Sequence, residues 1–408
     1  MRFHVRNIFT LTLFAVTTFT VFLTVRHKLS IFRTSFFPRK KHSTKCGNLY
    51  QNTIVHHSVR KKPRTFSRKA DHFPEDRLHV DTTSDKKKCP QLYEIARSML
   101  SGEKIKIPYE TSNTRWKFRD SIDSRDILEK TKLRWNHPWH QGDSAETRRK
   151  LQKYNVSART ISARKYVITY AQDCCEMSKK RAVNQAIDVG KADFAEAFDV
   201  SELSVPFQIS HQNLLRHRKG AGYWLWKPYI ILKTLLTKMN DGDLLIYHDA
   251  RSYFIKDLGP LYKACMDAEP SVLTFHQPNE ESMYSKRDAF ILMGMDNPKV
   301  YQKKQTQRYS GLQVYMKSCT TIQFLMEYLA YSADRRIVSD DKNVMGKPNF
   351  EGFIENRHDQ TVLSLLSKKW GILEMRDPCT CDRNKFTQNY GYASGPYHSM
   401  YVNDRAGV

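Results

Sequence analysis

Apolar residues follow two repeating patterns along the chain. Short runs rich in β-branched and aromatic residues predict strands, and runs with apolar positions three and four residues apart predict helices. From about residue 165 onward the two kinds of run alternate, which favours an α/β fold with a mostly parallel sheet flanked by helices. The predicted strands are Lys165–Tyr170, Phe194–Phe198, Leu244–Tyr247, Ser271–Phe275 and Gln307–Tyr315, and the predicted helices include Pro90–Leu100, Ser178–Val189, His211–Arg218, Leu258–Ala268, Thr320–Tyr331 and Thr361–Lys369.

The stretch Gly220–Arg251 combines a loop, a helix, a turn and a buried strand. Pro228 suits the first turn of the helix, and Asn240–Gly242 has the composition of a helix end. The strand that follows stops at His248 and Asp249. In an open α/β sheet, ligands bind beyond the carboxyl ends of the strands, so this ionisable pair is a candidate site.

Lys227 lies at the start of the same helix, where free backbone N–H groups and positive potential favour phosphate. Tyr223, Trp224 and Trp226 are placed to hold a base or a sugar. From the residues alone, the alternative of core aromatics and a simple strand-end cap remains equally open.

Three further places are candidate ligand-binding positions because of where they lie in the predicted elements. Tyr170 and Ala171 end the first strand, whose following loop meets the nucleotide in doubly wound sheets, although ordinary strand-end residues are the default. Gly311 lies inside a strand, which often marks the close approach of a ligand or a second backbone. His358 and Asp359 begin the last helix, where Asp359 also suits a plain N-terminal cap.

Four segments together resemble a family of nucleotide-diphospho-sugar transferases, glycosyltransferases with the GT-A type of Rossmann-like α/β fold. The segments are Gly220–Leu232 with the string GYWLWKPYIIL, Gly242–Ala250, Lys286–Asp288 and Asn356–Gln360 with the helix that follows it. The resemblance covers about residues 164–373. Two departures are Thr361, where the family has serine, and Arg251, where the family has a glycine that lets backbone approach the ligand.

The resemblance implies transfer of a sugar from a nucleotide-diphosphate donor to a hydroxyl acceptor on a glycan or glycoconjugate. Asp249 and His248 would hold a divalent metal on the diphosphate, with His358 as a later ligand and Mn²⁺ preferred because of the imidazoles. Asp359 would act as base or orient the acceptor.

The Asp-x-Asp metal motif common in GT-A enzymes is incomplete, because Tyr247 stands two residues before Asp249. Without a metal, Lys227, Arg251 and the helix start would neutralise the leaving diphosphate. The donor-binding residues expected overall are Tyr170, Ala171, Tyr223, Trp224, Lys227 and Arg251. The alternative function is a catalytically inactive carbohydrate-binding protein on the same fold.

Residues 8–25 are uncharged and mostly apolar, which predicts a membrane-spanning signal anchor. The resemblance, the sequon Asn155-Val156-Ser157 and eight cysteines favour a single-pass type II protein of the Golgi membrane, or of the endoplasmic reticulum, with its catalytic part in the lumen. More positive charge follows the span than precedes it, which argues for the opposite topology. A transit peptide is a further alternative, since no acidic residue precedes Asp71.

The net charge of +25 would suit a nucleic-acid partner, but no nucleic-acid motif accompanies it. The basic clusters lie in low-complexity sequence, which indicates a solvated stem. A lumenal compartment would allow disulfides among Cys46, Cys89, Cys265, Cys319, Cys379 and Cys381, but the sequence does not give their connectivity. The predicted organisation is a tail at 1–7, an anchor at 8–25, a basic stem at 26–88, a connection at 89–160, a catalytic domain at 161–378 and a tail at 379–408.

Overall fold

The computed structural model describes residues 90–103, 154–172, 176–302, 305–372, 374–375, 377–379 and 401–403. The predicted anchor at 8–25 and stem at 26–88 lie outside these residues. Within the described ranges, no helix is both long enough and apolar enough to cross a bilayer.

The chain folds around a six-stranded mixed sheet with the order β2-β1-β3-β6-β5-β7. β6 runs antiparallel to both of its neighbours, while the other pairs are parallel. The described chain is therefore α/β, with five of the six strands pointing one way. The strands are β1 (Lys165–Tyr170), β2 (Phe194–Phe198), β3 (Leu244–His248), β5 (Val272–Glu280), β6 (Thr306–Met316) and β7 (Glu374–Met375), and a separate pair joins β4 (Ser252–Phe254) to β8 (Tyr401–Asn403).

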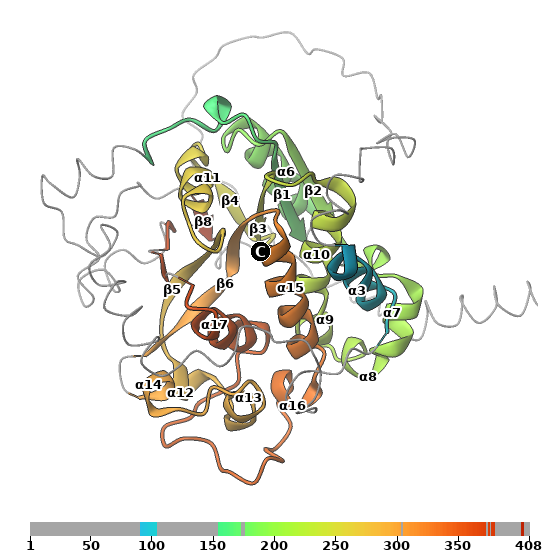
Figure 1. Ribbon diagram of the computed structural model, residues 1–408, viewed down its shortest axis with the longest axis vertical. Helices are drawn as coiled ribbons and strands as arrows, with labels where there is room; N and C mark the ends of the chain where they lie inside the picture. The colour runs from blue at the N-terminus through green and yellow to red at the C-terminus, as the bar shows by residue number, and fades with distance from the viewer. Residues whose placement is uncertain are drawn as a thin grey trace, which may run out of the picture. The chain divides into compact units, whose positions relative to one another are not determined.

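Helices cover both faces of the sheet (Figure 1). One group, α3, α10 and α15, packs together, and α17 packs on β6 and α15; α6 contacts β1 and β2, and α11 contacts β5 and β6. The α-helices are α3 (Pro90–Leu100), α6 (Glu176–Asp188), α7 (Val205–Ser210), α8 (Gln212–Leu215), α9 (Gly220–Tyr223), α10 (Trp226–Lys238), α11 (Gly259–Met266), α12 (Glu281–Tyr284), α13 (Arg287–Leu292), α14 (Pro298–Tyr301), α15 (Cys319–Ser332), α16 (Arg335–Val338) and α17 (Asp359–Lys369), with 3₁₀ turns η4 (Ala158–Thr160) and η5 (Val200–Glu202).

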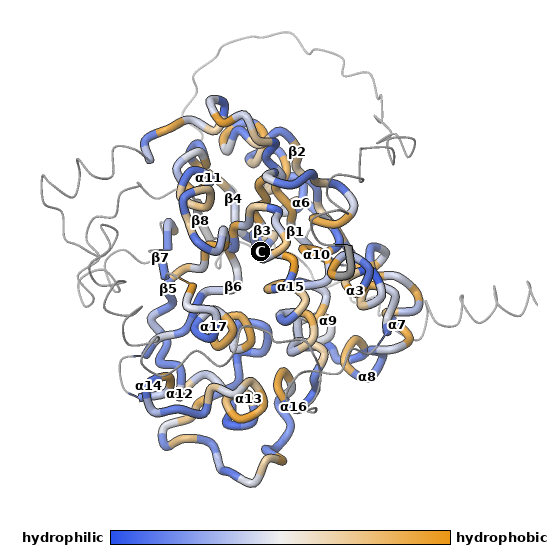
Figure 2. The backbone as a smooth tube through the Cα atoms, in the orientation of Figure 1, coloured by the Kyte–Doolittle hydropathy of each residue, from blue (hydrophilic) through white to orange (hydrophobic). Residues whose placement is uncertain are grey.

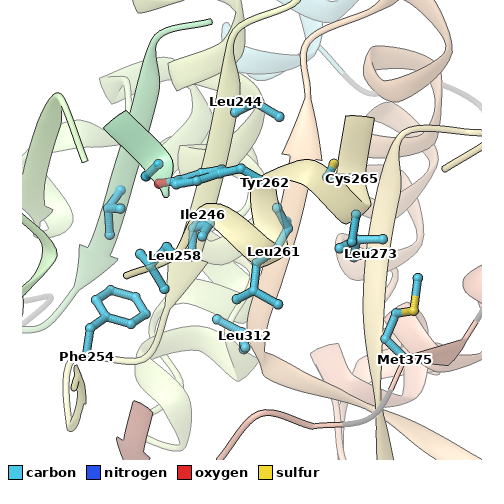
Figure 3. Close-up of a cluster of buried hydrophobic side chains, with 14 of the residues drawn as sticks. Leu244, Ile246, Phe254, Leu258, Leu261, Tyr262, Cys265, Leu273, Leu312 and Met375 are labelled. Atoms are coloured by element: carbon cyan, nitrogen blue, oxygen red, sulfur yellow. The ribbon is translucent and has the colours of Figure 1, made fainter. Parts of the chain in front are cut away.

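One core cluster lies between the sheet and α11. Leu244 and Ile246 share a face of β3 because side chains alternate along a strand, and with Leu312 of β6 they lie close to Leu261 and Tyr262 (Figure 3). All five are fully buried. Burial of each large apolar side chain contributes roughly 1.5–3 kcal/mol, so this face of β3 is fixed by packing.

The opposite face of β3 carries Leu245 and Tyr247 toward α10 and α15. Tyr247 is fully buried, and its ring lies against Trp226 of α10 at a centroid distance of 6.4 Å. The segment between α16 and α17 is mainly hydrophilic (Figure 2).

The cysteine predictions have mixed outcomes. Cys319 and Cys379 are each disulfide-bonded, whereas Cys265 of α11, another of the six candidates, is a free, buried thiol. Burial raises the pKa of Cys265, which keeps the thiol protonated and unreactive. The predicted helix at His211–Arg218 is too long, because the α-helical part is only Gln212–Leu215 before the chain enters a strained turn.

Candidate functional site

The ammonium of Lys227 lies between two carboxylates at the carboxyl end of β3. Its Nζ is 2.6 Å from Asp359 Oδ2 and 3.6 Å from Asp249 Oδ1. The Lys227 side chain is 1% exposed. Burial alone would lower its pKa, but the two carboxylates outweigh this effect and raise the pKa above its ordinary value. Lys227 is therefore a permanent buried cation.

Three elements meet at this cluster, which we call the Lys227 cluster: Lys227, Asp249 and Asp359. Lys227 belongs to the first turn of α10, Asp249 follows β3, and Asp359 is the first residue of α17. Ser310 of β6 completes the shell, with its carbonyl 3.3 Å and its hydroxyl 3.4 Å from Nζ. The ammonium thereby ties α10 to β6 and α17.

Asp249 is the accessible member of the cluster. Its side chain is 40% exposed, against 5% for Asp359. The Tyr247 hydroxyl donates a 2.7 Å hydrogen bond to Asp249 Oδ1. Burial and then the Asp249 charge raise the pKa of Tyr247 well above its usual value, so this hydroxyl stays protonated. The protein thus fixes Oδ1 of Asp249 by a hydrogen bond, while the carboxylate as a whole is accessible to solvent.

Gly311 makes room for this carboxylate. The Asp249 N–H donates to the Gly311 carbonyl at 3.0 Å, which continues the β3–β6 pairing. A Cβ at residue 311 would lie 2.7 Å from Asp249 Oδ2 and 2.2 Å from the Tyr309 hydroxyl. Both distances are shorter than real Cβ contacts, so the glycine admits the Asp249 and Tyr309 side chains.

The short segment α9 and the Trp224 that follows it form a left-handed turn before α10, because the backbone angles inside α9 are not those of an α-helix. Positive φ angles occur at all five consecutive residues, 59° at Gly220, 49° at Ala221, 99° at Gly222, 53° at Tyr223 and 61° at Trp224. Only glycine adopts this region without cost, so three residues are strained. Strain of this kind persists where surrounding structure enforces it and is common at binding sites.

The strained turn places two aromatic rings against His358, another residue with a positive φ. The Trp224 ring stacks on the His358 ring at a centroid distance of 5.4 Å, and Tyr223 lies 5.0 Å from it. His358 has φ of 55° and immediately precedes Asp359. Its Nδ1 is 2.6 Å from the Val338 carbonyl, and burial lowers its pKa, so the neutral ring donates to that carbonyl.

Tyr170 and Trp226 form a stacked pair beside the cluster. Their ring centroids are 3.8 Å apart with an interplanar angle of 12°, and both side chains are buried. The Tyr170 hydroxyl donates to Gln172, and the Ala171 N–H donates to the Phe198 carbonyl. β1 runs parallel to β3, with Ile168 opposite Tyr247, so Tyr170 and Ala171 lie at the same carboxyl end of the sheet as Asp249. Their role in binding the nucleotide stays a prediction.

His248 points to the other face of β3. Its ring packs on Phe254 at 4.7 Å, and its Nδ1 lies 3.1 Å from the Asp249 carbonyl. Burial lowers its pKa to about 4. Because strand side chains alternate, His248 shares the face of Ile246 and is directed away from Tyr247 and the Lys227 cluster.

Arg251 shares a turn with Asp249. The Ser252 N–H donates to the Asp249 carbonyl at 2.8 Å, so residues 249–252 form a β-turn. The Arg251 side chain is exposed, and no hydrogen bond or ion pair to it occurs within the described ranges. Its guanidinium is therefore available to a ligand.

The placed residues do not fit the expected manganese site. Among the described residues, no group of three or more His, Cys, Asp or Glu side chains is arranged to hold a metal ion. His248 faces the other side of the strand. The His358 Nδ1 donates to a backbone carbonyl, and its Nε2 lies 3.7 Å from Asp340, which is not part of the Lys227 cluster. The Lys227 ammonium already fills the space between the two carboxylates.

The Lys286–Asp288 motif anchors the segment that leads to Asp359. The buried Asp288 carboxylate accepts the Val344 N–H at 2.7 Å and the Met345 N–H at 3.1 Å. Lys286 donates to the Asp341 carbonyl at 2.8 Å. The motif therefore holds the backbone of residues 341–345 in place, in the segment that precedes Asp359.

Sequence reasoning missed Tyr247, Tyr309 and Ser310. Tyr247 had a usable signal, since it lies two residues before Asp249 and so shares its face of the chain. Ser310 and Tyr309 had none, because the pairing of β6 with β3 brings them to the cluster.

No protein-family model matches the chain, and no curated protein matches it. Among solved structures, it is similar to the WbbM bifunctional glycosyltransferase, with 13% identity, a TM-score of 0.35 and coverage of 61% of this chain and 47% of that one. It is also similar to mouse xyloside xylosyltransferase 1, with 10% identity, a TM-score of 0.34 and coverage of 60% and 98%. At these values the function must be inferred from the site.

Proposed function

We propose that the protein is a glycosyltransferase that moves a sugar from a nucleotide-diphosphate donor to a hydroxyl acceptor on a glycan or glycoconjugate. The observation that supports this most is the exposed Asp249 carboxylate, held beside buried Lys227 at the carboxyl end of β3. This is the edge of an α/β sheet where ligands bind.

The reaction needs a carboxylate that the substrate can reach. The bond between the anomeric carbon and the diphosphate oxygen breaks, and its electron pair leaves with the nucleoside diphosphate. The acceptor oxygen bonds to the anomeric carbon, and its proton passes to a base. Asp249 is our candidate for this base or for a group that orients a sugar hydroxyl, because it is the more exposed carboxylate of the Lys227 cluster.

Asp359 acts on the reaction indirectly in this proposal. Its carboxylate is buried and 2.6 Å from Lys227 Nζ, so it fixes the cation that faces Asp249. Tyr223, Trp224, Tyr170 and Ala171 are proposed to border the donor, with Trp224 the partly exposed aromatic ring among them. Stacking of a sugar face on such a ring would orient it over Asp249.

The test is donor turnover by the full 408-residue chain. Release of nucleoside diphosphate is followed for a panel of nucleotide sugars with simple glycoside acceptors. Asp249→Asn removes the base at nearly constant shape, so turnover should fall by about 10²-fold or more while the chain stays folded. Equal turnover by wild type and Asp249→Asn, or no release from any donor by folded protein, would contradict the proposal.

A catalytically inactive sugar-binding protein remains the second candidate, because one specific observation favours it. Asp359, expected to work at the reaction centre, is instead engaged by Lys227. Binding of a nucleotide sugar with no turnover of any acceptor would favour this candidate.

The location proposed is the lumenal side of the Golgi or endoplasmic reticulum membrane, through an anchor at residues 8–25. Two disulfide-bonded cysteines, Cys319 and Cys379, support an oxidising compartment.

A further inference from the structure

We infer that this site handles its nucleotide diphosphate without a divalent metal, with Lys227 in place of the metal between the carboxylates and Arg251 meeting the diphosphate. The inference rests on the proposed function and specifies how its leaving group is neutralised. It departs from the manganese dependence that the sequence resemblance implies.

The first support is the occupancy of the Lys227 cluster. A metal that bridged Asp249 and Asp359 would need the position of the ammonium, which lies 3.6 Å and 2.6 Å from their oxygens. Displacing Lys227 would leave a side chain that is 1% exposed without a counter-charge, and an unpaired buried charge is strongly destabilising. The protein itself therefore balances these carboxylates.

The second support is that Asp249 has no neighbouring group in the Lys227 cluster that would help it to coordinate a metal ion. A magnesium or manganese ion on Asp249 alone would take its other oxygen ligands from water and the diphosphate, so the protein would hold it through this one carboxylate. Beside Asp249, the Tyr247 hydroxyl donates a 2.7 Å hydrogen bond to Oδ1, and the Lys227 ammonium lies 3.6 Å from the same oxygen. The ammonium repels a metal ion, and the Tyr247 hydroxyl directs its proton at the carboxylate oxygen that such an ion would need.

The third support is the exposed guanidinium of Arg251, two residues after Asp249 in the chain. Arg251 shares the β-turn of Asp249 and is exposed. Two cations on the His358 side of the site have protein partners, Lys219 in Asp340 at 3.0 Å and Lys286 in the Asp341 carbonyl at 2.8 Å. A guanidinium binds phosphate oxygens with two parallel hydrogen bonds and needs no metal.

The experiment measures binding of UDP, GDP and ADP to the full chain by calorimetry, once in EDTA and once with manganese. We expect one of them to bind in EDTA, with manganese changing the dissociation constant less than about twofold. Arg251→Ala should weaken that binding about tenfold or more, and Arg251→Lys should recover part of it. Arg97→Ala is the matched control, because Arg97 is an exposed arginine on α3 and its loss should leave binding unchanged.

A second measurement separates this inference from the proposed function. Manganese alone is titrated into the full chain and followed by electron paramagnetic resonance, for wild type and Asp249→Asn. Manganese binding that disappears in Asp249→Asn, nucleotide binding only with manganese, or an unchanged Arg251→Ala variant would overturn the inference. Failure of every nucleotide to bind in either buffer would count against the proposed function, and the manganese titration would still decide the metal question.

Discussion

At the scale of single residues, Lys227 and Asp359 form a buried ion pair. Removing one of the two charges should destabilise the fold more than removing both. Lys227→Met would leave Asp359, 5% exposed, without its partner at 2.6 Å. Breaking a buried pair from one side costs about 3–5 kcal/mol, so the free energy of unfolding should fall by that amount in urea titrations. The matched control is Lys347→Met, which removes an ion pair to Asp296 from a lysine that is 55% exposed and should cost less than about 1 kcal/mol.

The double variant makes this prediction specific to the pair. Lys227→Met with Asp359→Asn removes both charges, so it should recover a large part of the stability lost in Lys227→Met alone. If the two single losses simply add in the double variant, the side chains contribute independently and the ion-pair account is wrong.

His248 predicts a pH dependence of stability. Burial lowers its folded pKa to about 4, below the ordinary value of about 6.5, so the unfolded chain binds the proton more readily. Its contribution is complete above about pH 6.5 and is lost as pH falls toward 4, a decline of about 3 kcal/mol in the free energy of unfolding. His248→Gln should flatten that decline in urea titrations between pH 7 and 4.5. An identical pH profile for the variant would show that other groups cause it.

At the scale of elements, the left-handed turn before α10 gives a sharp comparison between two glycines. Gly220→Ala places a Cβ 2.2 Å from the Trp224 ring, and Gly346→Ala places one with nothing within 4 Å, although both residues have positive φ. Each alanine incurs roughly 1–2 kcal/mol of backbone strain. Only Gly220→Ala must also displace Trp224, so it should lose more stability and show a changed tryptophan fluorescence. Equal losses for the two variants would mean that the turn does not hold the ring.

Local patterns predicted the elements better than their pairing. The strands Lys165–Tyr170 and Phe194–Phe198 and the helix Pro90–Leu100 have the predicted bounds, because their periodicity is contained in the segment itself. The antiparallel direction of β6 depends on contacts with β3 and β5, which no local pattern shows.

The candidate site also divides into residues that a local sequence pattern identifies and contacts that depend on distant segments packing together. Position after a buried strand singled out Asp249 and the start of a helix singled out Lys227. That Lys227 would be buried against Asp359, 132 residues later in the chain, is a property of the packed helices α10 and α17. His248 was chosen as the neighbour of Asp249, yet alternation along β3 directs it to the opposite face.

At the scale of the whole molecule, the basic excess and the fold concern different parts of the chain. The lysine and arginine clusters at 39–41, 60–62 and 86–88 precede the described residues. In the folded part, many cations are paired inside the protein, as Lys368 is with Glu281 and Arg308 is with Glu374. The charge of +25 is therefore a poor guide to the chemistry of the site, and it fits a basic segment between the proposed anchor and the folded part.

The proposed topology makes a prediction at Asn155. Asn155-Val156-Ser157 is the sole N-glycosylation sequon in the chain, and the Asn155 side chain is exposed. If the folded part enters the lumen, the full chain made in cultured animal cells should carry a glycan that a peptide N-glycosidase removes, seen as a gel shift. Asn155→Gln should abolish the shift without loss of stability, whereas Ser157 is unsuitable for this test because its hydroxyl donates to Asp257 at 2.5 Å. An unshifted chain that added protease digests in intact microsomes would place the folded part in the cytosol, as the charges flanking residues 8–25 suggest.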